Sequence, residues 1–267
     1  MKKMIFLMMV FVTVFITLSI DSVYGFMMKR PPHHEYGNVV INNFSEKNNI
    51  APVVYNHWLH RAKYTCRVCH LDLNFIMKAN GTGITEDANK KGLYCGACHN
   101  GEEAFAPEEK DSSGEASKKN CDRCHSYGNG VKFEKNFYLF TKNFPRAKFG
   151  NGVNWIKAEQ EGHIKLKDYI EGVSPKRVRD EDQTDAVLTT KIVEMPEIIF
   201  SHKKHAVWNG CKFCHPDMFR DKIGATEFTM EEIFAGKFCG ACHGKVSFPT
   251  FDCQRCHSKA IIVKETK

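Results

Sequence analysis

The cysteines of this 267-residue chain constrain it more than any other feature. All twelve fall into six pairs with two intervening residues, and each pair is followed at once by a histidine. Two thiols at this spacing can form thioethers with the vinyl groups of one haem, while the next residue offers an imidazole nitrogen to the iron. The motifs are Cys66, Cys69 and His70; Cys95, Cys98 and His99; Cys121, Cys124 and His125; Cys211, Cys214 and His215; Cys239, Cys242 and His243; and Cys253, Cys256 and His257. The pattern predicts six covalently attached c-type haems, each with one proximal histidine.

Two other kinds of cysteine chemistry compete with this interpretation. Zinc ribbons also use cysteine pairs and histidines, but zinc does not require a histidine at one fixed position after every pair. Disulfides, whether structural or redox-active, leave the same histidines unexplained. Because every cysteine belongs to a motif of the same form, haem attachment accounts for the pattern better than either alternative.

The amino-terminal segment has the composition of an export signal. Lys2 and Lys3 precede an uncharged apolar stretch from Met4 to Ile20, and Val23 and Gly25 then supply small residues at the positions that a signal peptidase reads. This order is typical of a signal peptide, so we expect cleavage after Gly25 and a mature chain that begins at Phe26. An uncleaved membrane anchor is the alternative, because the apolar stretch is nearly long enough to span a bilayer.

The formal net charge of +7 does not point to a nucleic-acid partner. Cleavage would remove Lys2, Lys3 and Asp21, which leaves +6. Each attached haem would then add two ionisable propionates, so the assembled protein would be neutral to acidic. We therefore expect redox proteins, and no nucleic acid, as partners.

The first three motifs and the last three are copies of one unit, the first unit and the second unit. Both units carry a His-x-x-His pair at the same interval before their first cysteine. The middle motifs agree more closely, since residues 92–99 read GLYCGACH and residues 236–243 read GKFCGACH. Between the second and third motifs the first unit has twelve extra residues. The stretch from Glu108 to Gly114 in this insertion has the composition of a solvated loop, with a docking loop for a partner as the alternative.

These observations divide the chain into segments and predict its fold class. The expected segments are residues 1–25 (signal peptide), 26–51 (amino-terminal extension), 52–125 (first three-haem unit), 126–196 (linker) and 197–267 (second three-haem unit). With one haem for about every 40 residues of the mature chain, little protein is left for a conventional core. We expect two tandem three-haem modules that are mainly irregular, with short α-helices, little β-structure and haems as much of the core.

The linker contains no cysteine and has two distinct parts. Between Trp155 and Gly172, apolar residues that include Ile156, Ile164 and Ile170 have spacings that suit an amphipathic helix. The charged run from Lys176 to Asp185 is typical of exposed chain. We expect this segment to cover haem edges rather than to form a domain of its own.

The sixth ligand of each iron decides between electron transfer and catalysis, since an open position would let a substrate bind. Seven histidines lie outside the motifs: His33, His34, His57, His60, His163, His202 and His205. The two His-x-x-His pairs are the strongest candidates, because a spacing of three places both imidazoles on one side of a helical turn, from which they can reach different haems. A lone histidine is usually a surface residue, but the repeated interval before a motif argues against that here.

In these motifs the chain resembles the class III multihaem cytochromes c, in particular the three-haem domains found singly and in tandem in the periplasm of metal- and sulfur-reducing bacteria. The resemblance covers about residues 52–125 and 197–257. It implies that the first histidine of each pair binds the first haem of its unit and the second histidine the second haem. The implied pairs are His57 with His70, His60 with His99, His202 with His215, and His205 with His243. It also implies a periplasmic location, with an extracellular one as the alternative.

The third haem of each unit departs from the commonest pattern of this family, which places a distal histidine shortly before the second motif. Neither unit has a histidine there. Some tandem three-haem cytochromes use methionine, and Met230 resembles that ligand, with ordinary core packing as the alternative. In the first unit the aligned residue is Glu86, so Met77 becomes the candidate. The rivals are His33, His34 and His163 for Met77, and Met218 for Met230.

The whole pattern favours an electron carrier or conduit without a substrate of its own, and not an enzyme, because the irons supply the redox chemistry and the protein sets their spacing and ligands. It would link membrane or periplasmic redox proteins to a terminal acceptor at the outer membrane or outside the cell, as in anaerobic respiration. One alternative is a multihaem reductase with an open iron, notably at His125. The other is a subunit of an extracellular haem filament, in which His33 and His34 would bind a neighbouring subunit's haem.

Overall fold

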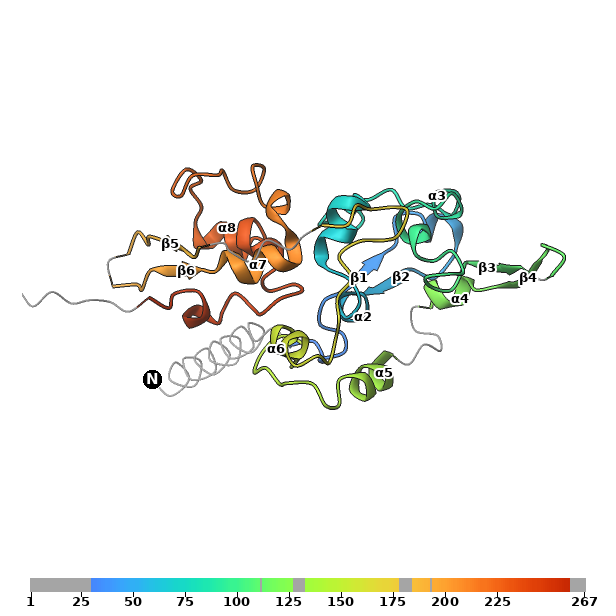
Figure 1. Ribbon diagram of the computed structural model, residues 1–267, viewed down its shortest axis with the longest axis horizontal. Helices are drawn as coiled ribbons and strands as arrows, with labels where there is room; N and C mark the ends of the chain where they lie inside the picture. Colours follow the sequence, from blue (N-terminus) through green and yellow to red (C-terminus); the bar gives the residue numbers. More distant parts are fainter. Residues whose placement is uncertain (1–29, 111, 127–132, 178–183, 193, 260–267) are drawn as a thin grey trace, which may run out of the picture. The chain divides into compact units, whose positions relative to one another are not determined.

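The computed structural model describes residues 30–110, 112–126, 133–177, 184–192 and 194–259 (Figure 1). The predicted signal peptide, residues 1–25, lies outside these ranges. Among the described residues, no helix combines the length and the apolar character needed to cross a bilayer. The contacts discussed below all lie within the compact part of the chain that begins at His33.

Short helices and single turns, joined by long irregular stretches, make up most of the described chain. The α-helices are α2 (His57–Arg61), α3 (Glu86–Lys90), α4 (Cys121–Cys124), α5 (Phe133–Phe140), α6 (Trp155–Gln160), α7 (His202–Asn209) and α8 (Met230–Phe234). The single turns are η1 (Glu46–Asn48), η2 (Val68–Asp72), η3 (Tyr94–Ala97), η4 (Cys211–Phe213), η5 (Phe238–Ala241) and η6 (Cys253–Arg255). Three two-stranded antiparallel sheets are formed by β1 (Asn38–Ile41) and β2 (Val53–Asn56), β3 (Glu108–Lys110) and β4 (Ala116–Lys119), and β5 (Ala186–Leu188) and β6 (Ile198–Phe200). The predicted fold class is confirmed.

Each unit begins with a two-stranded ladder that leads directly into its His-x-x-His helix (Figure 1). In the first ladder Asn38 of β1 lies opposite Asn56 of β2, and in the second Ala186 of β5 lies opposite Phe200 of β6. The β-branched residues in these short runs favour strands. The first strand of each ladder precedes the segment predicted for its unit, so the amino-terminal extension and the end of the linker each add a strand to the unit that follows.

A threonine-capped helix follows the first motif in both units. At the start of α3, Thr85 Oγ1 accepts the backbone N–H of Ala88 at 3.1 Å. At the start of α8, Thr229 Oγ1 accepts the backbone N–H of Glu232 at 3.2 Å, and the Glu232 carboxylate accepts in return from the Thr229 backbone. These caps satisfy N–H groups that would otherwise have no partner at a helix start. The two units therefore share this helix as well as their motifs.

Each threonine-capped helix packs tightly on the turn that carries the second motif. A Cβ atom added at Gly96 in η3 would lie 1.9 Å from the backbone oxygen of Asn89 in α3. A Cβ added at Gly240 in η5 would lie 1.8 Å from the backbone oxygen of Ile233 in α8. Only glycine therefore fits directly after the first cysteine of these middle motifs.

The insertion in the first unit forms a hairpin: residues 108–110 of the predicted solvated loop are a strand, and residues 112–115 are an exposed turn. β3 pairs with β4, and Glu108 lies opposite Lys119. Asn120 closes the base of the hairpin, since its side-chain amide donates to the Ala106 carbonyl and the Glu109 carboxylate, both at 2.9 Å. The composition alone predicted a loop, but the insertion is long enough to fold back and pair its own backbone groups.

The linker contains less helix than its apolar spacing predicted. α6 ends at Gln160, well before the predicted end at Gly172. Gly162 adopts a φ of 77°, and the backbone N–H of His163 bonds back into α6, which are features of a glycine-terminated helix. Ile164 is buried all the same. Its burial comes from packing on other elements rather than from a continued helix.

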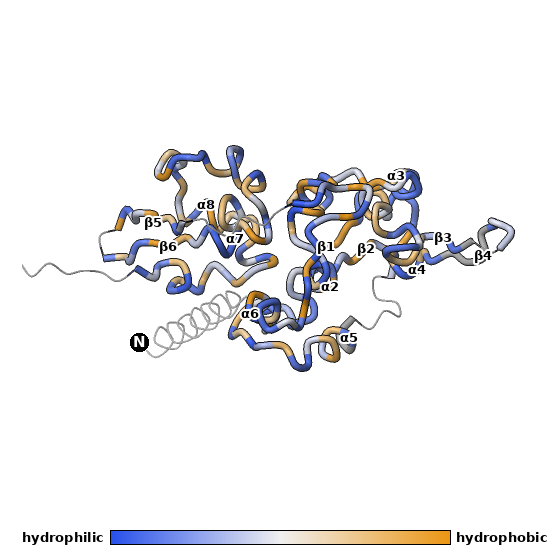
Figure 2. The backbone as a smooth tube through the Cα atoms, viewed as in Figure 1, coloured by the Kyte–Doolittle hydropathy of each residue, from blue (hydrophilic) through white to orange (hydrophobic). Residues whose placement is uncertain are grey.

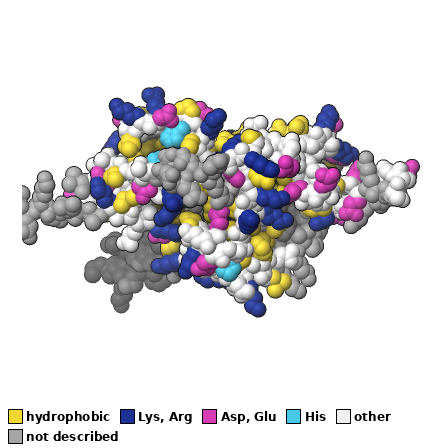
Figure 3. Space-filling model, in the orientation of Figure 1, with side chains coloured by type: hydrophobic (Ala, Val, Ile, Leu, Met, Phe, Trp, Pro, Cys, Tyr) yellow, Lys and Arg dark blue, Asp and Glu magenta, His cyan; other side chains and the backbone are white. Residues whose placement is uncertain are grey.

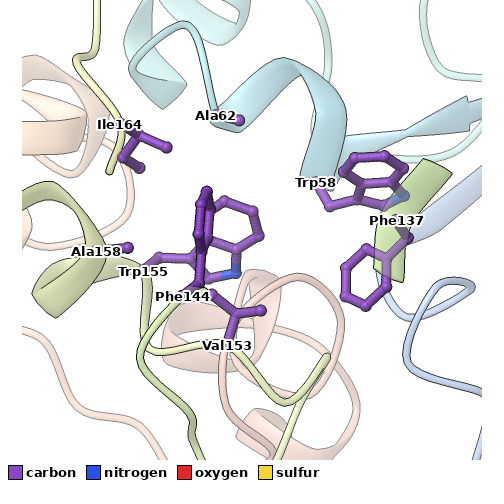
Figure 4. Packing of buried hydrophobic residues seen from close by; sticks show 8 residues of the cluster. All are labelled: Trp58, Ala62, Phe137, Phe144, Val153, Trp155, Ala158 and Ile164. Carbon is purple, nitrogen blue, oxygen red and sulfur yellow. The ribbon is translucent and has the colours of Figure 1, made fainter. Parts of the chain in front are cut away.

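A cluster of buried apolar side chains joins the linker to the first unit (Figure 4). Its members are Trp58, Ala62, Phe137, Phe144, Val153, Trp155, Ala158 and Ile164, with Leu166 and Trp208 packed against it. The rings of Trp58 and Phe137 meet edge to face, with 5.2 Å between their centroids. Trp58 and Ala62 lie on the side of α2 away from His57 and His60, because of the helical period. Side chains of the linker therefore form a protein core behind the helix that carries the predicted distal histidines.

Hydrophobic residues elsewhere in the described chain are scattered in short runs (Figure 2). On the face shown in Figure 3, Lys and Arg side chains are interspersed with Asp and Glu side chains. The basic net charge is therefore not gathered into one patch on this face.

Candidate haem sites

Each motif folds into about one helical turn. In five of the six motifs the backbone N–H of the histidine donates to the carbonyl of the first cysteine, at 2.8 to 3.0 Å. These histidines are His99, His125, His215, His243 and His257. The first motif instead places Cys69 and His70 in η2, a π-helical turn. A turn of this size brings two thiols and an imidazole together, as attachment of one haem requires.

Nine of the ten histidines predicted to bind iron use Nδ1 for a hydrogen bond with a backbone carbonyl, at 2.6 to 3.0 Å. The histidines and their acceptors are His57 with Gly37, His60 with Asn56, His70 with Phe75, His99 with Phe105, His125 with Ala51, His202 with Thr184, His205 with Ser201, His215 with Phe219, and His257 with Pro196. A carbonyl oxygen can only accept, so Nδ1 donates and Nε2 keeps its lone pair. This is the tautomer that binds a metal through Nε2, and the hydrogen bond also holds the ring in place.

His243 is the exception among these ten histidines. Its buried Nδ1 has no well-aligned hydrogen-bond partner, although the backbone carbonyl of Phe248 lies close enough to favour its protonated form. In the first unit the matching residues, His99 and Phe105, make this bond at 3.0 Å. In the second motif of the second unit, His243 Nδ1 therefore faces the equivalent carbonyl, but the hydrogen bond between them is poorly aligned.

Three of the four predicted histidine pairs lie ring to ring at nearly one separation. The centroid distances are 6.4 Å for His57 and His70, 6.4 Å for His60 and His99, and 6.2 Å for His205 and His243. Two metal–nitrogen bonds of about 2 Å each, plus the distance from each nitrogen to its ring centre, add up to roughly the same length. His202 and His215 make no such ring contact within the described chain. The pairings stay predictions, and the geometry supports three of them.

Burial keeps many of these imidazoles neutral. It lowers the pKa of His57, His60 and His243 to about 4. Burial also lowers the pKa of His70, His99 and His205 from the usual value. A metal binds only the neutral imidazole, so these side chains are in the ligand form at neutral pH.

The ladders explain how the first histidine of each pair is held. Because Asn38 lies opposite Asn56, the next residues outward are Gly37 and His57, and the His57 Nδ1 donates to the Gly37 carbonyl at 2.6 Å. In the second unit the same extension of the ladder brings His202 to the Thr184 carbonyl at 2.8 Å. These strands were not predicted from the sequence. The consecutive β-branched residues in Asn38–Ile41 and Val53–Tyr55 are the signal that could have found them.

An aromatic residue on the second strand of each ladder orients the other histidine. Tyr55 stacks on His60 with 4.3 Å between ring centroids, and Phe200 stacks on His205 at the same distance. The interplanar angles are 27° and 26°. Two units that differ in sequence at this position therefore hold the second distal histidine in the same way.

The third motif of each unit is tied to the start of that unit. His125 Nδ1 donates to the Ala51 carbonyl at 2.7 Å, and His257 Nδ1 donates to the Pro196 carbonyl at 2.9 Å. Each acceptor lies six residues before the first histidine of its His-x-x-His pair. The proximal side of the third haem site is therefore built alike in both units.

The two methionines predicted for the third haems do not occupy equivalent positions. Met230 is the first residue of α8 and is 39% exposed, while the first residue of α3 is Glu86. Met77 lies in the loop after the first motif. In this loop the backbone N–H of Ile76 donates to the Thr82 hydroxyl, and in the second unit that of Arg220 donates to the Thr226 hydroxyl. These equivalent bonds align Met77 with Asp221. Met77 and Met230 stay predictions. If both are ligands, they approach their irons from different parts of the unit.

Within the described chain, the rival histidines show no hydrogen bond from Nδ1 to a backbone carbonyl. His34 places Nε2 3.6 Å from the Glu35 carboxylate, and His163 places Nε2 3.5 Å from the Glu161 carboxylate. His33 lies against Gly152, and Met218 lies in the turn after His215 with its backbone N–H bonded to Cys214. The His34 side chain is only 14% exposed, which disfavours a role as ligand for a neighbouring subunit.

The cysteine environments disfavour thiol–disulfide redox chemistry. Burial raises the pKa of the Cys69, Cys95 and Cys242 thiols to about 12 and that of Cys239 to about 11. A redox-active cysteine needs a pKa lowered towards neutrality, so that the thiolate forms readily. These pairs have the opposite environment.

A comparison with protein families matches the chain to the family described as cytochrome c7 and related cytochrome c. The match covers residues 53–126 and 198–258, which together are just over half of the chain. Each matched range begins at the second strand of a ladder and ends one residue after the histidine of a third motif.

Several solved structures are similar to this chain in sequence. The C-terminal hexaheme fragment of GSU1996 is 24% identical over 86% of this chain and 99% of that chain, with a TM-score of 0.26. A c7-type three-heme cytochrome domain is 35% identical over 33% of this chain and 99% of that chain, with a TM-score of 0.26. The dodecaheme cytochrome c GSU1996 is 25% identical over 86% of this chain and 75% of that chain, with a TM-score of 0.26. The comparison with curated proteins gave no match.

Proposed function

Because this chain belongs to the family of cytochrome c7 and related cytochrome c, we propose that it carries six covalent haems and conducts electrons between redox proteins outside the cytoplasm. Membership makes it a haem-bearing electron-transfer protein. A haem supplies reversible one-electron chemistry at its iron, while the protein sets access and ligands.

The paired imidazoles carry the proposal of a conduit. His57 and His70 have parallel rings at a separation that fits one metal ion between them, and both Nδ1 atoms are bonded to backbone carbonyls. An iron with imidazoles on both sides has no position left for a substrate. Ligands that are held by backbone bonds also need little rearrangement when the charge of the iron changes. Both properties suit electron transfer rather than catalysis.

The apolar stretch near the amino terminus supports a location outside the cytoplasm. The segment from Met4 to Ile20 has the composition of a signal peptide. We propose the periplasm as the location, with a membrane or periplasmic redox protein as donor. The acceptor would be a redox partner at the outer membrane or outside the cell.

The function is tested on protein produced with its haems attached. The intact mass should exceed that of the mature polypeptide by six haems, and a potentiometric titration should show all of them cycling reversibly. Carbon monoxide should bind to almost none of the reduced irons at neutral pH. A smaller mass increment would overturn the six-haem assignment, and stoichiometric binding of carbon monoxide would overturn the conduit role.

One observation favours a reductase as the second candidate. Glu86 occupies the helix position at which the second unit carries Met230, so α3 cannot supply the haem on His125 with the thioether that α8 is predicted to supply to the haem on His257. An iron that is open at His125 would bind carbon monoxide or nitrite at one site per chain. The same titration in the presence of nitrite separates this candidate from the conduit.

A further inference from the structure

The two units meet at the first motif of each. Within the described chain, η2 of the first unit contacts η4 of the second. The His70 ring and the Phe213 ring meet edge to face, with 5.9 Å between centroids and an interplanar angle of 87°. Phe213 lies between Cys211 and Cys214, inside the turn that would hold the haem on His215. The proximal ligand of one haem site therefore touches the attachment turn of another.

A further contact brings the same motifs together. Arg67, which follows Cys66, lies against Gly210, and a Cβ at Gly210 would come within 3.0 Å of the Arg67 guanidinium. Gly210 has a φ of 70°, a backbone conformation that favours glycine. The residue after the first cysteine of the first unit therefore packs against the residue before the first cysteine of the second unit.

Arg61, the last residue of α2, occupies the centre of the junction. Its guanidinium lies 4.9 Å from the ring centroid of Trp155 in the linker and 4.8 Å from that of Trp208 in α7. It also donates to the backbone carbonyl of Val246 at 3.1 Å. A guanidinium that lies over two indole rings gains cation–π attraction from each of them. One side chain of the first unit therefore binds the linker and the second unit together.

Other contacts surround Arg61 and hold the same three segments. Trp208 Nε1 donates to the Glu159 carboxylate at 2.8 Å, which joins α7 to α6. The Tyr36 hydroxyl donates to the Ser247 carbonyl, one residue beyond the acceptor of Arg61. The turn that follows the second motif of the second unit is thus seated beside the start of the first ladder.

We propose that Arg61 is a positioning residue that holds the second unit against the first, so that electrons cross between the units at the His70 and His215 haem sites. The proposal rests on the proposed function and goes beyond it by naming the crossing point and the residue that maintains it. The ring contact between His70 and Phe213 connects these two sites across the junction. Arg61 acts through the position of the units and touches neither iron.

The proposal has a direct electrostatic consequence. Oxidation of one haem adds a positive charge, which makes oxidation of a neighbouring haem harder by an amount that falls with distance and with the local dielectric. The interaction between the His70 and His215 sites should therefore be the largest of all interactions between units. It should shrink when the junction opens and water enters.

The test compares the holoprotein with Arg61→Met, Arg61→Lys and Arg146→Met. Methionine keeps an unbranched apolar side chain but loses the charge and the bond to Val246, whereas lysine keeps the charge without the planar group. Arg146 is exposed and bonds only to the Lys142 carbonyl among the described contacts, so its replacement is the matched control. Stepwise oxidation followed by NMR of assigned haem methyl signals reports each pairwise interaction.

We expect the interaction between the His70 and His215 sites to fall to about half or less in Arg61→Met, to fall by less in Arg61→Lys, and to stay unchanged in Arg146→Met. Interactions within each unit should be preserved. A largest inter-unit interaction at another pair, such as His70 with His243, would overturn the crossing point. An unchanged interaction in Arg61→Met would overturn the role of Arg61.

A second readout separates this proposal from the proposed function. Small-angle X-ray scattering of the same holoproteins should show a larger radius of gyration for Arg61→Met and no change for Arg146→Met. The variant Trp208→Leu removes the α7 side of the same junction. If Arg61→Met does not fold with its haems, the same two measurements are made on Trp208→Leu. Failure of the conduit role would appear in the native protein, as missing haems or an open iron, before any variant is measured.

Discussion

The rings of His57 and His70 lie 6.4 Å apart and within 8° of parallel, and each is bonded through Nδ1 to a backbone carbonyl. His57 is held by Gly37, which belongs to the amino-terminal side of the first ladder, and His70 by Phe75, which follows its own motif. The first haem site is therefore built from both a short-range and a longer-range backbone contact. His57, the predicted distal ligand, can be replaced without disturbing the attachment motif that contains His70.

Replacement of His57 by alanine should open the sixth position of the first haem. Cys66, Cys69 and His70 remain, so the haem content should be unchanged while about one carbon monoxide binds per chain. His163→Ala, which removes a histidine that faces Glu161, should bind no more than the native protein. Visible spectra of the reduced protein under carbon monoxide measure both. A closed iron in His57→Ala would show that another side chain is the ligand.

Met230→Ala should remove one His/Met haem. Near-infrared magnetic circular dichroism of the oxidised protein should show a His/Met charge-transfer band, and this variant should lose it or reduce it. The reduction potential of one haem should fall, because a thioether favours ferrous iron relative to an imidazole. Met218→Ala is the control within the same unit. A band of full intensity in Met230→Ala would refute the assignment.

Met77→Ala distinguishes the two third haems. If Met77 is a ligand, the native band should have the intensity of two His/Met haems and Met77→Ala should halve it. If the first unit has no thioether at this haem, Met77→Ala should leave the band unchanged, and Glu86→Met should increase it. The increase in Glu86→Met is expected if a ligand can reach the third iron only from the first residue of α3 or α8.

Gly96→Ala and Gly240→Ala should each disrupt a middle motif. The added Cβ would lie 1.9 Å and 1.8 Å from a backbone carbonyl oxygen, which forces the motif turn away from α3 or α8. We expect a loss of roughly 3 kcal/mol and a lower guanidinium midpoint for unfolding of the holoprotein. Gly83→Ala is the control, since nothing lies within 4 Å of its Cβ position. Native midpoints in both variants would contradict this packing.

Asp168→Ala should destabilise the contact between the linker and the first motif. The Asp168 carboxylate accepts from Arg67 Nε at 2.7 Å and also from the Thr65 hydroxyl, and the side chains of Asp168 and Arg67 are both about 90% buried. Loss of one partner leaves a buried charge, which costs about 3 kcal/mol. Glu103→Ala removes the exposed partner of the adjacent Lys167 and should cost less than about 1 kcal/mol. Equal midpoints for the two variants would show that the buried pair contributes little.

The sequence was sufficient for the features that depend on local chemistry. Haem attachment needs two thiols and an imidazole at one spacing, so the six motifs could be recognised without a fold. The duplication and the two His-x-x-His pairs were visible for the same reason. Composition misled at the insertion, where β3 and β4 pair, and apolar spacing misled after Gly162, where the helix stops. In both places a backbone contact outweighed the local signal.

The tertiary structure decided how those ligands are held and where the units meet. The Nδ1 acceptor of His57 lies 20 residues away, that of His125 lies 74 away, and the carbonyl bound by Arg61 lies 185 away. No local pattern specifies such partners, because a backbone carbonyl looks the same at every position until the fold presents one of them. The sequence by itself thus determined which residues can bind haem. Long-range packing decided the Nδ1 acceptors of His57, His125, His202 and His257, the distances within the histidine pairs and the contact between the first motifs of the two units.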